Sequence, residues 1–210
     1  MKMKILSMSC VLCFFMACAN AQTLPVIVEA ESGKAGSDWL VKTEGAIKFV
    51  TTQTDFASRD YPGGDHKVIT YKITFPKAGT YDLYARVRVG SEGANDDSFY
   101  YAKGFGTKTS TADDDEWVMC NGLFDKGYAD AQAGSKVDDG GSTGTQEWKW
   151  INVSKFNGGE PSVSFKVKEG ALTQTFQIGG RENGLDIDKF AFGLASDSYS
   201  VQVLNSANAK

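Results

Sequence analysis

The sequence predicts an all-β fold, a β-sandwich of the jelly-roll type. The composition is typical of strands and turns, with 23 glycines, 13 phenylalanines and 8 tyrosines among 210 residues. Short runs in which apolar and polar residues alternate recur along the chain. Turns rich in glycine or proline separate these runs, and the long helical patterns that βαβ units need are few.

Residues 1–21 have the pattern of a signal peptide, so we expect the fold to begin after them. Two early lysines are followed by an apolar run at residues 5–17, which is too short to span a membrane, and by a small-residue cleavage site at residues 19–21. The alternative is a lipoprotein signal with Cys18 as the lipidated residue. Both interpretations predict a secreted or cell-surface protein, with no membrane association unless Cys18 carries a lipid.

Removal of the signal changes the properties of the remaining chain. Three of the four cysteines lie in the signal, so only Cys120 remains and no disulfide can form within the mature chain. The net charge of −4 becomes more negative, because the signal contains two lysines and no acids. An acidic secreted chain is a poor candidate for binding nucleic acid. We expect one domain at residues 22–195, followed by a polar tail or the start of a linker at residues 196–210.

The strands of this domain are predicted from alternation and from the turns between them. The clearest run begins at residue 79, where Tyr81, Leu83 and Ala85 share one face. Turns are predicted at residues 62–64, 76–79, 158–161 and 169–170. Ten strands are expected, at residues 26–31, 46–52, 67–75, 79–89, 97–102, 116–121, 147–153, 162–168, 172–179 and 185–192. Residues 103–144 contain one convincing strand, and long loops of this kind are usually functional or disordered.

The first and last of these strands both carry paired carboxylates. Glu29 and Glu31 are two residues apart and so point the same way, as do Asp186 and Asp188. If the two strands pair, several negative charges lie together. Like charges at short range are costly unless a cation sits among them, so the pattern indicates a cation at this place.

The Glu-Ala-Glu segment at residues 29–31 and the Leu-Asp-Ile-Asp-Lys-Phe segment at residues 185–190 resemble the β-jelly-roll carbohydrate-binding modules of families 6 and 35. The resemblance covers residues 26–194 and is best at the two ends. It implies a galactose-binding-domain-like sandwich with a structural calcium ion. The calcium ligands that it implies are Glu29, Glu31 and Asp188.

A saccharide cleft is predicted from aromatic and polar residues. Sugar rings stack on aromatic planes, and their hydroxyl groups pair with carboxylates, amides and arginine. Trp148 and Trp150 share a strand face, and the alternative for each is a place in the core. The predicted sugar-binding residues are Trp148, Trp150, Asp96, Asp97, Tyr100 and Asn183.

The polar members of this set come from two loops. Asp96 and Asp97 precede the aromatic strand that carries Tyr100, and the alternative is that they are solvated loop acids. The resemblance implies a ligand-binding Asn in the loop before the last strand. Asn183 is the closest match to it, and Asp186 is the alternative counterpart.

These features together predict non-catalytic binding of a plant cell-wall polysaccharide. The resemblance implies a β-1,4-linked glycan, with xylan as the first candidate, and a glycoside hydrolase that is attached in a longer chain or associated. Gly-x-Ser-x-Gly, His-Glu-x-x-His and phosphate-loop patterns are absent from the sequence. One alternative is a jelly-roll glycoside hydrolase or polysaccharide lyase that uses loop carboxylates such as Asp114 and Asp139. Another is an adhesion domain that binds protein through its aromatic loops.

Overall fold

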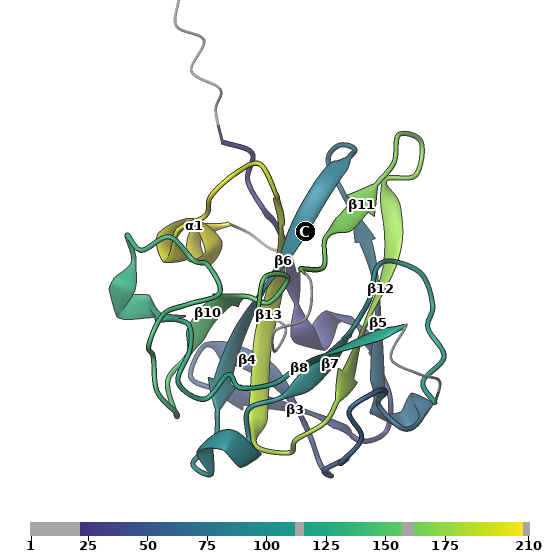
Figure 1. Cartoon of the computed structure of the whole chain (residues 1–210), viewed down its shortest axis with the longest axis vertical. Coiled ribbons are helices and arrows are strands. Elements are labelled where there is room, and N and C mark those ends of the chain that lie inside the picture. Colours follow the sequence, from purple (N-terminus) through teal and green to yellow (C-terminus); the bar gives the residue numbers. More distant parts are fainter. Residues whose placement is uncertain (1–21, 112–115, 157–161, 208–210) are drawn as a thin grey trace, which may run out of the picture.

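The computed structural model describes residues 22–111, 116–156 and 162–207 (Figure 1). Two antiparallel sheets pack face to face in these ranges, and the predicted all-β sandwich is confirmed. The one α-helix of the described chain is α1 (Val201–Ser206). No helix in the same ranges has the length and apolar character to cross a membrane.

The larger sheet has eight strands. Its main path is β3 (Trp39–Glu44), β4 (Ile47–Thr52), β13 (Leu185–Leu194), β6 (Gly79–Val89), β10 (Lys149–Asn152) and β9 (Tyr128–Ala129). Two further strands join it, β1 (Val26–Glu29) on β13 and β11 (Phe165–Val167) on β6. The predicted pairing of the first strand with the last is confirmed, with Val28 opposite Phe190 and Glu29 opposite Lys189.

The smaller sheet has five strands. Their order is β2 (Lys34–Ala35), β5 (Val68–Thr74), β12 (Thr173–Gly180), β7 (Phe99–Ala102) and β8 (Trp117–Cys120). The chain crosses between sheets after β1, β2, β4, β5, β6, β8, β11 and β12, and such repeated crossing is typical of a jelly roll. Short 3-10 helices lie in the loops: η1 (Ala30–Ser32), η2 (Asp65–Lys67), η3 (Gly93–Asn95) and η4 (Asp130–Gln132).

Each of the ten predicted strands is present, with ends that differ by up to three residues. Three short or exposed strands, β2, β3 and β9, escaped prediction. β3 is an edge strand on which Leu40 and Val41 are both exposed, so its sequence does not alternate between apolar and polar residues.

The main core lies between the sheets and consists largely of aromatic rings. Phe190 and Phe192 enter it from β13, and alternate residues from 81 to 89 enter it from β6 as predicted. Phe192 meets Phe165 and Phe176 edge to face, with ring centroids 5.3 Å and 5.1 Å apart. Each such pair contributes about 0.5–1.5 kcal/mol beyond its burial. The packed rings hold the sheets in place, and the outer faces are left for other roles.

A second hydrophobic cluster covers part of the outer face of the larger sheet. The chain after β13 folds back, and α1 packs on this face (Figure 1). Tyr199, Val201 and Leu204 are fully buried there against Trp150. The prediction of a polar tail or linker from residue 196 is therefore wrong. Apolar side chains on the outer face of the sheet need cover, and the described tail supplies it.

We expect Leu204→Ala to lower the free energy of unfolding by about 2–5 kcal/mol, because it leaves a cavity in the second cluster. Gln202→Ala on the same helix is the matched control, since Gln202 is exposed, and should change the free energy by less than about 0.5 kcal/mol. Urea unfolding of both variants measures the difference. Equal stability of the two variants would show that the tail is not part of the folded domain.

Candidate functional site

The outer face of the larger sheet also carries a partly exposed aromatic and charged surface. Trp148 directly precedes β10, Phe49 lies on β4, Arg88 on β6 and Asp186 on β13. These strands are neighbours in the sheet, so side chains from four strands meet. We name this the Trp148 surface and define it as Trp148, Phe49, Arg86, Arg88, Asp186 and Glu44.

Two guanidinium groups lie over the ring of Trp148. The Arg88 Cζ is 4.7 Å from the ring centroid and the Arg86 Cζ is 5.4 Å from it. Phe49 approaches the same ring edge-on, with the centroids 5.5 Å apart. Cation–aromatic contacts of this kind contribute about 0.5–1 kcal/mol each at exposed sites. They fix the orientation of the indole, which a stacking platform requires.

Carboxylates hold Arg88 in place. Its Nε and Nη2 donate hydrogen bonds to Asp186 Oδ2 at 3.0 Å and 2.8 Å, and its Nη1 donates to Glu44 Oε2 at 2.8 Å. Burial raises the pKa of Asp186, and the bonds from Arg88 oppose this shift. The surface therefore presents a balanced set of charges around an aromatic ring.

Arg86 connects this surface to the C-terminal tail. Its Nη1 donates to Asp188 Oδ2 at 2.6 Å, and its Nη2 donates to Asp130. Asp130 Oδ1 accepts a hydrogen bond from Asn205 Nδ2 at 2.9 Å, and Asn205 Oδ1 accepts one from Trp150 Nε1 at 2.7 Å. A chain of hydrogen bonds thus runs from α1 to Arg86, whose guanidinium contacts the partly exposed Trp148 indole.

Trp150 does not belong to the Trp148 surface. The two residues share a strand face as predicted, but Trp150 is 0% exposed. The tail covers it, with Tyr199 and Leu204 in the same cluster. The prediction that Trp150 stacks on a sugar is wrong, and its alternative as a core residue holds.

Asp96, Asp97 and Tyr100 are likewise buried, at most 6% exposed, so they do not reach a ligand in this structure. The Asp97 carboxylate accepts two backbone N–H groups of the 121–127 loop, at 3.1 Å and 3.3 Å. Asp96 accepts a backbone N–H of its own loop at 2.8 Å. The Tyr100 hydroxyl donates to the Ser58 carbonyl. These predicted contacts with sugar are corrected, because loop donors and acceptors already use the polar groups.

Asn183 is exposed in the loop between β12 and β13. Its backbone N–H donates to Asp55 Oδ1 at 2.8 Å, and its carbonyl accepts from the Thr51 hydroxyl at 3.1 Å. Thr51 is the β4 partner of Asp186, so Asn183 lies at the loop end of the sheet that carries the Trp148 surface. Its contact with a ligand stays a prediction.

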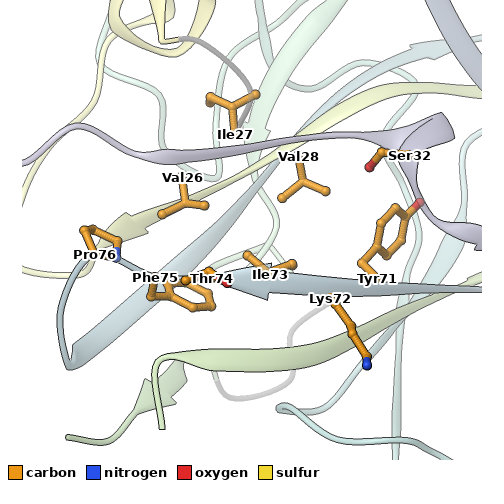
Figure 2. Close-up of a pocket in the computed structure, with 10 residues that line it drawn as sticks. All are labelled: Val26, Ile27, Val28, Ser32, Tyr71, Lys72, Ile73, Thr74, Phe75 and Pro76. Carbon is orange, nitrogen blue, oxygen red and sulfur yellow. The ribbon is translucent and has the colours of Figure 1, made fainter. Parts of the chain in front are cut away.

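A cavity of about 310 Å³ lies elsewhere, between β1 and β5 (Figure 2). Val26 and Val28 point into it from β1, and Lys72 points away from it. The Tyr71 hydroxyl at its end already donates to the Ala30 carbonyl at 2.7 Å. The lining mixes apolar side chains with Ser32, Lys72 and Thr74, and it shares no residue with the Trp148 surface.

The carboxylates predicted to bind calcium have protein cations as partners. Lys189 Nζ is 3.3 Å from Glu29 Oε1 and 3.7 Å from Asp188 Oδ2, and Arg86 also pairs with Asp188. Glu29 and Glu31 do not share a strand face as predicted, because β1 ends at Glu29 and Glu31 lies in η1. Within the described ranges, no three Asp, Glu, His or Cys side chains form a group that could hold a metal ion.

Two other observations fit a cation at this place. Glu31 Oε2 is buried and has no hydrogen-bond partner among the described residues. Burial raises the pKa of Glu29, Lys189 opposes this, and the charges of Asp188 and Glu31 add to the rise. Calcium would supply an oxygen-binding cation to an orphaned carboxylate and to this excess of negative charge. The calcium site therefore stays a prediction.

If calcium binds here, a chelator lowers the melting temperature, because the ion binds only the folded state. At a calcium concentration one hundred times Kd the stabilisation is about 2.7 kcal/mol, or roughly 5–10 °C. Calcium restores the loss and magnesium does not, since magnesium demands tighter octahedral geometry. Glu31→Gln should abolish the response, and exposed Glu169→Gln should keep it. Identical melting curves with and without chelator, on metal-free protein, would remove the site.

The alternative hydrolase or lyase interpretation relies on loop carboxylates, and one of these acids, Asp138, already has hydrogen-bond partners. Asp138 Oδ1 accepts hydrogen bonds from the Tyr128 hydroxyl at 2.6 Å and from the Gly140 N–H at 2.8 Å. This bond to Asp138, together with burial, raises the pKa of Tyr128 to about 12. Asp139 is exposed, and Asp114 lies outside the described residues.

Sequence reasoning missed most of the Trp148 surface. Phe49, Arg86, Arg88 and Glu44 were not among the predicted residues. A signal exists for the arginines, which are two apart on the polar face of β6. In the structure Arg88 lies opposite Asp186, and Arg86 lies opposite Lys189, next to the bulged Asp188. Phe49 and Glu44 gave no such signal, because their contacts with Trp148 and Arg88 depend on the strand order.

No protein-family model matches the chain, and no curated protein matches it. Among solved structures it is similar to a Podospora anserina GH26-CBM35 β-(1,4)-mannanase, at 14% identity and a TM-score of 0.46, over 81% of this chain and 27% of that chain. It is also similar to the Arthrobacter globiformis T6 isomalto-dextranase complexed with panose, at 12% identity and a TM-score of 0.42, over 80% of this chain and 23% of that chain. The chain thus spans about a quarter of the length of these proteins. Likenesses at such low identity concern the fold alone.

Proposed function

We propose that this domain binds a polysaccharide at the Trp148 surface and catalyses no reaction. One observation carries the proposal: a partly exposed indole on a sheet face is held against two guanidinium groups and has Asp186 and Glu44 beside them. The apolar C–H face of a sugar ring stacks on such an indole. The hydroxyl groups of the sugar then reach the charged groups at its edge.

A neutral glycan suits this surface better than an acidic one. Arg88 already makes three hydrogen bonds to carboxylates, and Arg86 makes two. A uronate carboxylate would therefore have to displace an existing ion pair. We propose a β-1,4-linked plant cell-wall glycan, with xylan as the first candidate on the strength of the resemblance.

The setting of this function follows from the sequence. The signal-peptide pattern of residues 1–21 sends the protein to the cell surface or the medium, where such polymers occur. An attached or associated glycoside hydrolase would use the domain to stay close to its substrate. Calcium, if bound near Glu31, would stabilise the sandwich and take no part in sugar contact.

Trp148→Ala should weaken binding of xylo- or cello-oligosaccharides by roughly 30-fold, or on the order of 2 kcal/mol, because a stacking aromatic residue acts as a hot spot. Isothermal titration calorimetry of the folded variant measures the loss. Tyr61→Ala is the control, since Tyr61 is a partly buried aromatic residue of the loop before β5. It should bind like the parent.

The result for Trp148→Ala decides where the ligand binds. A folded Trp148→Ala variant that binds like the parent would rule out the Trp148 surface. The loop end at Asn183 would then be the next candidate, and Asn183→Ala tests it. Trp150→Ala is not a suitable test, because it empties the second hydrophobic cluster.

We expect no product release from soluble xylan, glucan or pectin, with or without added metal ions. Glycoside hydrolysis needs two carboxylates on either side of one bond. On the Trp148 surface, Asp186 and Glu44 both pair with the same Arg88, so they are not two free carboxylates on either side of a ligand. Assays of reducing sugar and of unsaturated products measure turnover. Sustained release that Asp139→Ala abolishes would favour the hydrolase or lyase instead.

A further inference from the structure

A buried cation follows Trp148 in the sequence. Lys149 is 1% exposed, and because side chains alternate along a strand it points to the opposite face from Trp148, toward the inside of the sandwich. Gly127 has a φ of 92°, and a Cβ there would lie 3.3 Å from the Lys149 Cγ and Cδ. The alkyl stem of the lysine therefore packs directly on loop backbone, and its end is fixed in space.

Four backbone carbonyl oxygens surround the Lys149 ammonium. Nζ donates to the carbonyls of Leu123 and Phe124, at 2.6 Å and 3.1 Å, in one loop. It donates to those of Thr143 and Gly144, at 2.9 Å and 3.1 Å, in a second loop. An ammonium group has three protons, so the four acceptors share three donors. They surround the group as ligands surround a metal ion. We name these four carbonyls the carbonyl cage.

The electrostatic setting keeps this group charged at neutral pH. Burial lowers the pKa of Lys149 to about 8, while Asp125, Asp97 and Glu147 oppose the shift. In the described part of the chain, no carboxylate lies within salt-bridge distance of Nζ. The positive charge is therefore balanced mainly by the dipoles of the carbonyls.

The cage has the chemistry of a monovalent-cation site. Proteins replace the hydration shell of K⁺ with backbone carbonyl oxygens, and K⁺ and ammonium are close in size. Calcium prefers six to eight oxygens, usually with carboxylates among them, whereas the cage offers four neutral carbonyls.

We propose that the carbonyl cage is a monovalent-cation site that the chain fills with its own Lys149 ammonium. Through its hydrogen bonds the Lys149 ammonium links residues 123–124 to residues 143–144. The second of these segments leads along the chain to Trp148. Asp97 holds the first segment from the other side, through the N–H groups described above. Lys149 is thus a positioning residue for the loops beside the Trp148 surface, whatever that surface binds.

The test removes the ammonium and offers K⁺ in its place. Lys149→Ala should lower the melting temperature by roughly 10 °C in choline chloride, because four buried carbonyls lose their partner. Potassium chloride at equal ionic strength should restore most of the loss, in proportion to the logarithm of the K⁺ concentration once this exceeds Kd. Equal melting temperatures in the two salts would overturn the proposal.

Two matched variants separate a bound ion from a general effect of salt. Lys149→Met fills the cage without a charge, so it should be unstable in both salts. Lys72→Ala removes an exposed lysine and should behave like the parent in both. A potassium response in Lys149→Met as large as that in Lys149→Ala would contradict the proposal.

A measurement on the parent protein covers the case in which Lys149→Ala does not fold. Nitrogen-15 NMR of the lysine side chains should show slowly exchanging ammonium protons at pH 7 for two buried lysines, Lys149 and Lys67, which bonds to Asp38 and Thr54. The Lys149 signal should be missing from Lys149→Met or Lys149→Arg, and the Lys67 signal should remain. A neutral or rapidly exchanging Lys149 amine would overturn the proposal. If the parent binds no glycan but Lys149→Ala responds to potassium, the proposed function fails and the cation site stands.

Discussion

One extra residue in β13 determines how the larger sheet is arranged. The pairing of β13 with β6 shifts register between Ile187 and Lys189. Ile187 and Phe190 both face the main core, which an unbroken alternation would forbid, and the bulge accommodates the additional residue. Asp188 and Lys189 are both left outside the core. Asp188 then meets Arg86, and Lys189 meets Glu29, so both ion pairs depend on this bulge.

The ion pairs on the outer face serve orientation more than stability. Arg86 and Asp188 are both nearly buried. The free energy lost when two charges leave water offsets much of the free energy gained from their attraction. A pair of this kind selects one arrangement, because removal of either partner leaves an uncompensated charge. Arg86 is held at one end by Asp188 and at the other by Asp130, and its guanidinium lies over Trp148. The position of the partly exposed indole is thus set by Arg86 and Asp188, which are nearly buried, and by Asp130, which is half exposed.

The strands could be predicted from the sequence because apolar residues recur with a period of two, as on β6, even where the residues between them are also buried. The pairing of β1 with β13 was also considered from the sequence, whereas the bulge at Asp188 was not predicted. The roles of Trp148 and Trp150 could not be separated, because the two share a face and differ only in whether α1 covers them. That cover depends on a contact between residues far apart in the chain.

Loop acids posed a different problem for prediction. Asp96 and Asp97 have the neighbours of exposed residues, yet each accepts backbone N–H groups inside a loop, and no periodic pattern marks such bonds. The burial of Lys149 could not be predicted either, because its partners are backbone carbonyls, which every residue has. The partners of a polar side chain were therefore harder to predict than the burial of an apolar one.

The position of the tail restricts the direction in which a rigid polymer can lie. Along β6, Tyr84 lies beneath the tail, Arg86 is nearly buried and Arg88 is partly open. A chain laid parallel to the strands would therefore collide with α1 after a short distance. In the direction across the sheet, η4 follows β9 beyond β10, and its Asp130 pairs with Arg86. If the Trp148 surface binds a polymer as proposed, the tail would limit the orientations in which that polymer can lie on the sheet.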